Sequence, residues 1–236
     1  MARPSKEKHL IIGAGEVGRA LFEVLKDGYD VLLRDKQSDL EGRFDVLHIA
    51  YPPFKDFVSV TKNYVKQYRP KLVVIHATVP VGVTKKVGLN AVHSPIRGVH
   101  PHLAAGIRTF VKYFGGAKAK EAAKIFAALG VKTQTFQKAE TTELAKILDT
   151  TYYGWNIIFA KEAERLARKF KLDFDEVYTV PNKEYNEGYR KLGKPNVARP
   201  VLKAMPGKIG GHCVVPNCDL LDDWLTNTLK NRNKAY

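Results

Sequence analysis

The stretch HLIIGAGEVG, residues 9–18, decides the fold, because its apolar residues form a strand pattern that runs directly into a glycine-rich turn. In a G-x-G-x-x-G turn between a strand and a helix, Gly13 makes the tight bend, Gly15 lets a pyrophosphate approach the backbone, and Gly18 packs the helix against the strand. The N-terminus of that helix then faces the phosphates. The stretch therefore predicts a strand, turn and helix that bind a dinucleotide.

A second strand supports this interpretation. Residues 29–33 form a largely apolar segment that leads to Asp35, about 20 residues beyond the turn, where a ribose-binding acid is expected. An acid there accepts hydrogen bonds from a 2′-hydroxyl and repels a 2′-phosphate, which favours NAD over NADP. Arg34 beside it keeps the choice of cofactor open. The alternative is a structural glycine turn followed by a surface aspartate.

The segments that follow alternate between strand and helix patterns. The predicted strands are residues 44–50, 72–77, 89–93, 110–115 and 130–136, and the predicted helices are 20–25, 54–68 and 117–129. This alternation predicts an α/β fold class, a Rossmann-type doubly wound parallel sheet over residues 1–137. The residues expected to contact the cofactor are Gly13, Gly15, Glu16, Val17, Gly18, Asp35, Tyr51, Pro52 and Thr78.

Beyond residue 137 the apolar residues recur at helical spacing. The pattern predicts a mostly helical domain over residues 138–236, with one long central helix at 143–170 and a second helix at 174–189. A connection at 191–206 contains three prolines, and a short helix is expected at 219–230.

Composition limits the partners and the compartment. The chain has 236 residues, with 39 Lys and Arg against 24 Asp and Glu, so its formal charge is +15. This charge favours an acidic partner such as a dinucleotide, a sugar nucleotide or a nucleic acid, and the absence of an RNA-binding motif makes nucleic acid the least favoured. Two cysteines fit a reducing compartment, and there is no apolar run long enough to cross a membrane. The expected location is the cytoplasm.

Three histidines invite a functional interpretation. His48 lies inside a buried strand pattern, where a satisfied core residue is the expected role. His100 and His102 form an H-x-H pair without a nearby carboxylate or third ligand, which is a weak metal pattern. A turn or a substrate-side loop is the better interpretation, and no metal is predicted.

A glycine-rich loop, residues 206–217, presents Cys213. Such a loop can hold a thiol open to substrate. Two alternatives remain: a buried, inert Cys213, and a zinc site formed with Cys218 and His212. The zinc site needs a fourth ligand that the neighbouring sequence does not supply.

Four stretches, taken in order, resemble one family, the UDP-glucose/GDP-mannose (nucleotide-sugar) 6-dehydrogenases, and most closely the branch that oxidises UDP-N-acetylhexosamines. They are the dinucleotide turn, ATVPVGVT at 77–84, ELAKILDTTY at 143–152 with NIIFAKE at 156–162, and PGKIGGHC at 206–213. The resemblance runs from His9 to about Leu221. It implies a Rossmann domain, a long helix that forms a homodimer, and a further UDP-binding domain that a chain ending at Tyr236 would lack.

The resemblance also implies a chemistry. Family members oxidise a primary alcohol to a carboxylate in two hydride transfers to NAD. A thiolate traps the aldehyde, and the thioester formed by the second transfer is hydrolysed. By position, Cys213 matches the nucleophile, Lys146 matches the lysine that stabilises the alkoxide-like oxygen, and Thr78 matches a residue that helps to place a catalytic water.

Three positions depart from the family pattern. Thr150 replaces an asparagine, Ile96 replaces the glutamate of the hydrolytic half-reaction, and Asn217 aligns with an aspartate that follows the cysteine. Isoleucine cannot act as a base, and an amide orients water without taking its proton. Asp219 could substitute for the missing aspartate after a loop shift. With these departures, hydride transfer and trapping of the aldehyde by the thiol are still expected. Whether oxidation continues to the acid stays open.

Two other functions stay open. One is an NAD-dependent dehydrogenase of the 6-phosphogluconate or prephenate type, with His100 or His102 near the nicotinamide. The other is a divergent, non-catalytic NAD-binding homologue. A homodimer is expected through the long helix at 143–170, whose aromatic residues Tyr152, Tyr153, Trp155 and Phe159 are hard to bury within so short a chain.

Overall fold

The structure is a computed structural model, and it describes residues 7–35 and 40–236. The chain divides into two compact units, Met1–Lys146 and Ile147–Tyr236. The domain boundary predicted near residue 137 stays a prediction, because the long helix α6 (Ala139–Lys169) contributes residues to both units.

The first unit is built on one sheet, and the described residues form seven strands in the order β2-β1-β3-β4-β5-β6-β7. The strands are β1 (Lys8–Ile12), β2 (Asp30–Arg34), β3 (Val46–Ile49), β4 (Leu72–Ile75), β5 (Ala91–His93), β6 (Lys112–Gly115) and β7 (Thr133–Phe136). The first five run parallel, and β6 pairs antiparallel to β5 through His93 and Gly115. The predicted doubly wound α/β sheet is confirmed, with one antiparallel step near its β7 edge.

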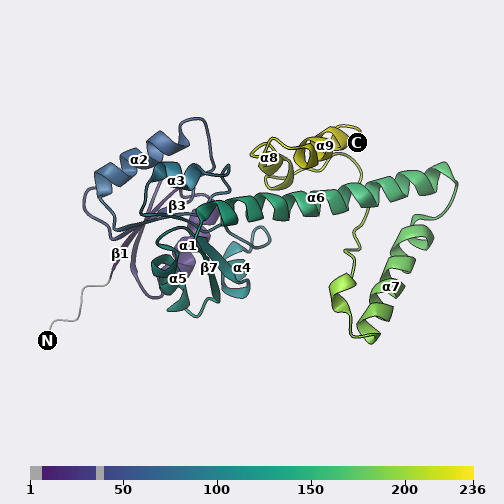
Figure 1. Cartoon of the computed structure of the whole chain (residues 1–236), viewed down its shortest axis with the longest axis horizontal. Coiled ribbons are helices and arrows are strands. Elements are labelled where there is room, and N and C mark those ends of the chain that lie inside the picture. The colour runs from purple at the N-terminus through teal and green to yellow at the C-terminus, as the bar shows by residue number, and fades with distance from the viewer. Residues whose placement is uncertain (1–6, 36–39) are drawn as a thin grey trace. The chain divides into compact units, whose positions relative to one another are not determined.

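Helices cover both faces of this sheet (Figure 1). One face carries α1 (Glu16–Leu25), α4 (Leu103–Thr109) and α5 (Ala119–Ala127), and the other carries α2 (Phe57–Tyr68) and α3 (Val83–Val87). Successive strand residues point to opposite faces, so Ile11 and Val46 join the first core while Leu10 and Leu47 join the second. A sheet buried on both sides explains why its strands are nearly continuous apolar runs.

The glycine turn follows β1 as the sequence predicts. Gly13 has a φ of +107°, a conformation that disfavours any side chain. A Cβ on Gly18 would lie 1.8 Å from the carbonyl oxygen of Gly13. The first turn of α1 therefore packs directly against the end of β1, which requires glycine at both positions.

Helix α4 has no counterpart in the sequence prediction, which describes this region only as a turn or loop. Leu103 and Ile107 bury themselves in the first core. Gly106, inside this short helix, brings its backbone against the preceding loop, because a Cβ there would lie 2.6 Å from the Cα of Gly98. A seven-residue helix with an internal glycine carries too weak a periodic signal for detection.

The second unit contains the remainder of α6 and several shorter elements. Helix α6 begins at Ala139, four residues before its predicted start. The predicted helix at 174–189 is a π-helical turn (Asp175–Thr179) that continues into α7 (Val180–Lys191), and the predicted connection contains a single 3-10 turn (Pro195–Val197). The elements that follow are α8 (Val214–Cys218) and α9 (Trp224–Asn233).

The helix predicted at 219–230 corresponds to α9, which begins later, at Trp224, and the short helix α8, which ends at Cys218, was not predicted. The carboxylate of Asp223 accepts a hydrogen bond from the backbone N–H of Leu225 (2.8 Å) and so caps α9, which leaves residues 219–223 as a connection. Gly154 on α6 allows α8 and α9 to approach, since a Cβ there would lie 2.6 Å from Val214 and 2.7 Å from Leu229.

None of the helices within residues 7–35 and 40–236 is long and apolar enough to cross a membrane.

Candidate dinucleotide site and thiol loop

Two cavities of the first unit border the glycine turn. The larger, about 630 Å³, contacts Gly15 and the first turn of α1 on one side and Pro101 and His102 on the other. A Cβ on Gly15 would meet no atom within 4 Å, so the backbone faces open space here. A helix N-terminus beside an open cavity is suited to bind an anionic group.

The smaller cavity, about 190 Å³, lies between the turn and α2. Its lining residues are Ile12, Gly13, Asp35, Tyr51, Pro52, Phe54, Val60 and Tyr64. The structure thus brings four predicted cofactor residues together, and it adds aromatic walls that the sequence analysis did not identify. An apolar, aromatic cavity with one carboxylate at its edge has the chemistry needed to hold an adenosine.

Tyr51 is held rigidly in this cavity. Its hydroxyl lies 2.6 Å from the hydroxyl of Thr61, and burial raises the pKa of Tyr51 to about 12. The side chain therefore stays neutral, and its ring forms a fixed wall.

Arg34, which kept the choice of cofactor open, is engaged inside the unit. Its guanidinium donates to the hydroxyl of Tyr68 (2.6 Å) and lies 5.0 Å from the ring centroid of Tyr64. The side chain is buried, whereas Asp35 lines the cavity. The guanidinium lies over the rings of two tyrosines, Tyr64 and Tyr68, so Arg34 has a structural role.

The loop that carries Thr78 is fastened by Glu143, a residue that the sequence analysis did not single out. Glu143 is fully buried on α6, and its carboxylate accepts the backbone N–H groups of Gly82 (2.6 Å) and Thr84 (2.8 Å). These two bonds place a negative charge at the start of α3, where such a charge is stabilising. Thr78 itself is half-buried in the loop after β4.

The histidine expectations are resolved by their contacts. His48 is fully buried with both ring nitrogens hydrogen-bonded, which confirms a satisfied core residue. His100 pairs with Glu16 (2.6 Å), whereas His102 lines the larger cavity. Within residues 7–35 and 40–236, no group of three or more His, Cys, Asp or Glu side chains could hold a metal.

In the second unit, the two cysteines differ in environment. Cys213 precedes the first turn of α8 and is partly exposed. Cys218 is fully buried, lies 3.7 Å from the hydroxyl of Thr151, and has its pKa raised by burial. The accessible thiol is therefore Cys213.

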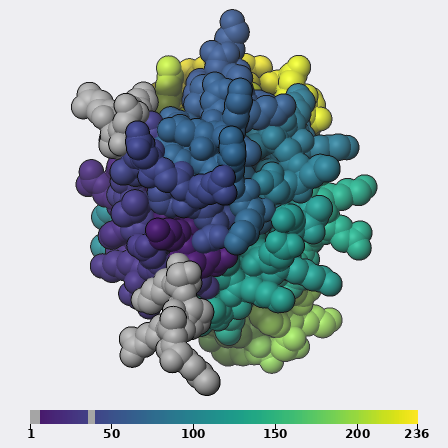
Figure 2. Space-filling model, turned by 90° about the vertical axis from the view of Figure 1, so that its left-hand side faces the viewer, coloured from purple at the N-terminus to yellow at the C-terminus, as the bar shows by residue number. Residues whose placement is uncertain are grey.

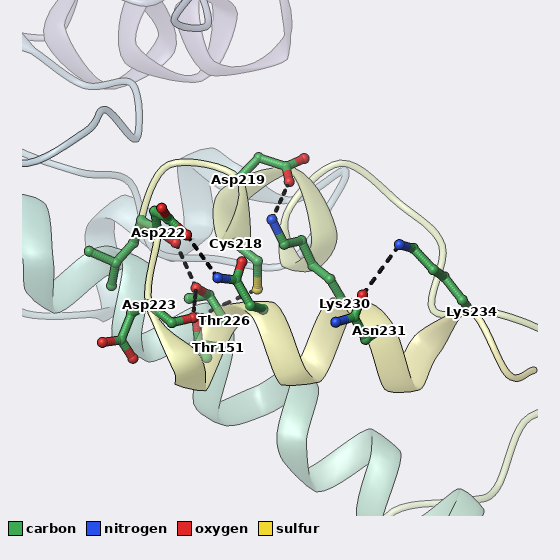
Figure 3. A network of polar contacts seen from close by, with 11 residues as sticks. Thr151, Cys218, Asp219, Asp222, Asp223, Thr226, Lys230, Asn231 and Lys234 are labelled. Atoms are coloured by element: carbon green, nitrogen blue, oxygen red, sulfur yellow. Dashed lines mark hydrogen bonds and ion pairs between the residues drawn. The ribbon is translucent and has the colours of Figure 1, made fainter.

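Two further predicted residues meet beside this thiol loop. The side-chain amide of Asn217 donates to the hydroxyl of Thr150 (3.3 Å), which in turn donates to the carbonyl of Ile147 (3.0 Å). Asp219 instead pairs with Lys230 (2.9 Å) at the exposed end of α8 (Figure 3). In the first unit Ile96 is buried in the core.

Lys161 anchors the loop that leads to Cys213. This side chain is buried on α6, and its ammonium donates to the carbonyls of Met205 and Gly207, the latter at 2.6 Å. Lys161 belongs to the NIIFAKE segment at 156–162, for which the sequence alone indicates no role at this position. Its signal is a lysine among the buried positions of a long helix, which is rarely tolerated without partners.

The sheet order, the glycine turn and the adjoining cavities define a Rossmann-type dinucleotide-binding fold. No family model matches the chain, and no curated protein matches its sequence. Solved structures do match it in three dimensions.

One match is a UDP-D-ManNAc dehydrogenase from Pyrococcus horikoshii, at 20% identity and a TM-score of 0.77, covering 96% of this chain and 68% of that one. A UDP-glucose dehydrogenase from Pyrobaculum islandicum matches at 15% identity and a TM-score of 0.73, covering 100% and 70%. A Mycobacterium tuberculosis 3-hydroxyisobutyrate dehydrogenase matches at 16% identity and a TM-score of 0.69, covering 96% and 92%. At identities of 15–20%, this structural similarity establishes the fold alone.

Proposed function

We propose that the chain is an NAD-dependent dehydrogenase that oxidises a CH–OH group of an anionic, sugar-type substrate through a thiol intermediate. The observation that carries the cofactor assignment is the aromatic cavity that joins Gly13, Asp35 and Tyr51 beside the glycine turn. The residues fit NAD, because Gly15 faces open space where a pyrophosphate would approach α1. When bound, NAD accepts the hydride that leaves the alcohol carbon.

The choice of NAD over NADP rests on Asp35 and Arg34. Asp35 lines the cavity and supplies the acceptor that a ribose 2′-hydroxyl needs. Arg34 is held by Tyr68 and Tyr64. A carboxylate that faces the ligand and a guanidinium engaged by aromatic rings together favour the unphosphorylated cofactor.

The chemical roles follow the resemblance. Cys213, as a thiolate, adds to the aldehyde carbon, and the carbonyl oxygen takes up a proton to give a thiohemiacetal. Lys146 supplies a positive charge for the oxygen that loses its proton, and Thr78 helps to orient water. Asn217, supported by Thr150, can orient water but cannot deprotonate it, so hydrolysis is expected to be the slow half.

The basic charge of the chain and the names of two structural neighbours support an anionic sugar substrate. The formal charge is +15, and those neighbours are dehydrogenases of UDP-D-ManNAc and UDP-glucose. The chain spans about two thirds of the length of each. The substrate class is therefore part of the proposal.

A single-turnover assay tests this function. The protein is mixed with NAD and a panel of UDP- and GDP-sugars, and NADH absorbance is followed beside intact-protein mass for the wild type, Cys213→Ala and Cys218→Ala. NADH together with an adduct that Cys213→Ala abolishes and Cys218→Ala retains is the expected result, because only Cys213 is accessible. NAD binding without NADH from any sugar would instead indicate a non-catalytic homologue.

A second dehydrogenase chemistry is favoured by two observations. His102 lines the larger cavity, and the chain covers 92% of a 3-hydroxyisobutyrate dehydrogenase. In this alternative a histidine serves as the acid or base, and the thiol has no role. NADH without an adduct, undiminished in Cys213→Ala, would select it.

We further propose a homodimer through the α6 segment. Tyr152, Tyr153 and Phe159 expose 64%, 53% and 64% of their surface on this helix. Trp155 differs from the sequence expectation, because it is half-buried and its indole N–H donates to the carbonyl of Leu225 (3.2 Å).

The dimer predicts a concentration-dependent mass. Light scattering across a dilution series is expected to give a dimer that dissociates more readily when Tyr152 and Phe159 are both changed to serine, because the interface loses apolar area. A matched control changes Phe170 and Leu172, which are also exposed and lie just beyond the end of α6. A wild-type monomer at every concentration would contradict the dimer.

A further inference from the structure

Three imidazoles form a continuous chain through the interior of the first unit. His9 Nδ1 lies 2.9 Å from His48 Nε2, and His48 Nδ1 lies 3.0 Å from His76 Nε2. Adjacent rings lie edge to edge, with centroids 5.2 and 5.3 Å apart and planes inclined by 21° and 19°. The three side chains expose 0%, 0% and 2% of their surface.

The sheet places these residues on one face. His9 stands on β1 opposite Val46, His48 stands on β3 opposite Val74, and His76 follows the end of β4. Each histidine therefore lies two residues farther along its strand than the residue opposite the previous one. The row of three imidazoles therefore crosses three neighbouring strands diagonally, from the amino ends of the strands towards their carboxyl ends.

Both ends of this row of three imidazoles lie next to charged or polar groups. At the amino edge, His9 Nε2 lies 3.2 Å from a carboxylate oxygen of Glu7. At the other end, His76 Nδ1 lies 2.9 Å from the carbonyl oxygen of Ser94 and 3.4 Å from the amine of Lys112. The amine also donates to the Ser94 carbonyl (3.2 Å).

The four contacts of this histidine chain need one more N–H donor than three neutral imidazoles supply. The row of imidazoles makes four contacts in series, from Glu7 through the three rings to the Ser94 carbonyl. Each contact needs one proton between its two atoms. Three neutral imidazoles carry one N–H each and provide three. The fourth contact is satisfied either by Lys112, which donates to Ser94 and His76 as an ammonium or as a neutral amine, or by an additional proton on the imidazoles.

The two solutions contain the same number of protons. In the first, Lys112 is an ammonium that donates to Ser94 and His76, and every ring carries its proton on Nε2. In the second, Lys112 is a neutral amine, every ring carries a proton on Nδ1, and His9 carries a second on Nε2, facing Glu7. Only the positions of the protons differ.

We propose that His9, His48, His76 and Lys112 form a proton relay that shares one excess proton between Lys112 and the amino edge of the sheet. The inference concerns the first unit alone and does not depend on the proposed function.

Each transfer along the relay forms one N–H bond and breaks another. Lys112 gives a proton to Nδ1 of His76 while Nε2 of His76 gives its proton to Nδ1 of His48. Nε2 of His48 then gives its proton to Nδ1 of His9, which becomes an imidazolium beside Glu7. No group is oxidised or reduced, and the net result is that one positive charge moves from Lys112 to His9.

The surroundings match such a path. Phe126 covers its middle, with ring centroids 6.2 Å from His48 and 6.0 Å from His76, and it lies 5.1 Å from the Lys112 amine. Burial lowers the pKa of Lys112 to about 7. The ammonium and the neutral amine are thus both accessible near neutral pH.

The relay opens to solvent at its amino end. Glu7 exposes 43% of its side chain and, with Tyr29 and Asp45, lines an open cavity of about 340 Å³. The start of β1, in the darkest purple, reaches the surface on the face shown in Figure 2. A proton that arrives at His9 can therefore leave to water through Glu7.

The remaining charged and titratable groups define where the proton rests. Burial lowers the pKa of His9, whereas the hydrogen bond and charge of Glu7 and the charge of Asp45 raise it, and the ring of Tyr29 stacks on His9. At the other end, burial lowers the pKa of His76 well below its ordinary value, and Lys112, His48 and His93 lower it further. The proton is accordingly held at the two ends and passes through the middle.

The experiment is nitrogen NMR on the intact chain with 15N-labelled histidine. Through-bond couplings are expected from His9 Nδ1 to His48 Nε2 and from His48 Nδ1 to His76 Nε2. The nitrogen shifts of all three rings should lie between those of protonated and unprotonated atoms and should move together as pH crosses about 7, because coupled sites titrate as a unit.

Three variants sharpen the test. In His48→Gln, the glutamine amide can donate and accept hydrogen bonds but cannot pass a proton on. His9 and His76 should then titrate separately. Lys112→Met should move Nδ1 of His76 to its fully protonated shift. His93→Gln is the matched control, because His93 is equally buried but bonds Thr142 and Ala77 rather than the relay, and it should keep the ring-to-ring couplings and the common titration of the three relay rings.

Three rings with fixed tautomers in the wild type, responding to pH independently or not at all, would overturn the relay. This outcome is decided on the wild-type protein, so it holds even where His48→Gln fails to fold. Relay shifts that are unchanged by Lys112→Met would equally contradict a shared proton.

Discussion

Replacing Gly18 with alanine is expected to lower the free energy of unfolding of the first unit by about 3 kcal/mol, at the upper end of the usual cost of overpacking. A Cβ at this position would lie 1.8 Å from the carbonyl oxygen of Gly13. That oxygen belongs to the backbone at the end of β1, so it cannot move aside as a flexible side chain would. The change forces α1 away from the sheet.

The measurement can separate the two units. Both tryptophans, Trp155 and Trp224, belong to the second unit, so tryptophan fluorescence reports its unfolding. Hydrogen exchange followed by mass spectrometry reports β1 and α1 directly. Faster exchange in these two elements with an unchanged fluorescence transition is the expected pattern for Gly18→Ala.

Gly15→Ala is the matched control, with the opposite expectation. A Cβ on Gly15 would meet nothing within 4 Å, so the free energy of unfolding should stay within about 0.5 kcal/mol of the wild type. The same methyl group would enter the cavity proposed for the pyrophosphate, and NAD affinity should fall by about tenfold, or 1.4 kcal/mol. Unchanged affinity would place the pyrophosphate elsewhere, and wild-type stability of Gly18→Ala would contradict the close approach.

The second large effect is expected from Glu143→Ala. The substitution removes the carboxylate that accepts the N–H groups of Gly82 and Thr84, and it should cost about 3 kcal/mol, because charge-assisted bonds are lost and a buried donor is left unsatisfied. Urea unfolding measures this cost. Hydrogen exchange at 77–84 should accelerate, because the loop loses its attachment to α6.

Two variants calibrate this result. Glu143→Gln keeps one acceptor oxygen without the charge, so its cost should be about half that of alanine. Glu140→Ala removes a half-exposed carboxylate in the first turn of the same helix and should cost less than about 1 kcal/mol. A cost for Glu140→Ala equal to that of Glu143→Ala would show that the loop attachment is not the cause.

Most of the alternating elements were predictable, because strands buried on both faces form apolar runs and longer helices repeat every 3.6 residues. The failures are short elements. Helix α4 is held by Leu103 and Ile107 against the first core, and α8 by Val214 against Gly154 on α6. Neither helix is long enough for its own periodicity to identify it, so tertiary packing decides both.

The candidate site divides in the same way. Gly13, Gly15 and Asp35 were predictable, since the geometry of a phosphate-binding turn requires those residue types at that spacing. Glu143 and Lys161 were not, because their partners are backbone groups about 60 and 45 positions away in the chain. Backbone groups are the same in every residue, so a sequence carries no sign of which of them a buried charge will meet.

The sequence by itself determined most of the individual strands, the glycine turn and the acid that follows it, because each depends on residues that are near one another in the chain. The relay of His9, His48 and His76 was decided only by the tertiary structure. Each of these residues is by itself an ordinary buried histidine. The strand order β1-β3-β4 and the register of those strands bring the rings to 2.9 and 3.0 Å from one another, and only pairing between distant segments can create that spacing.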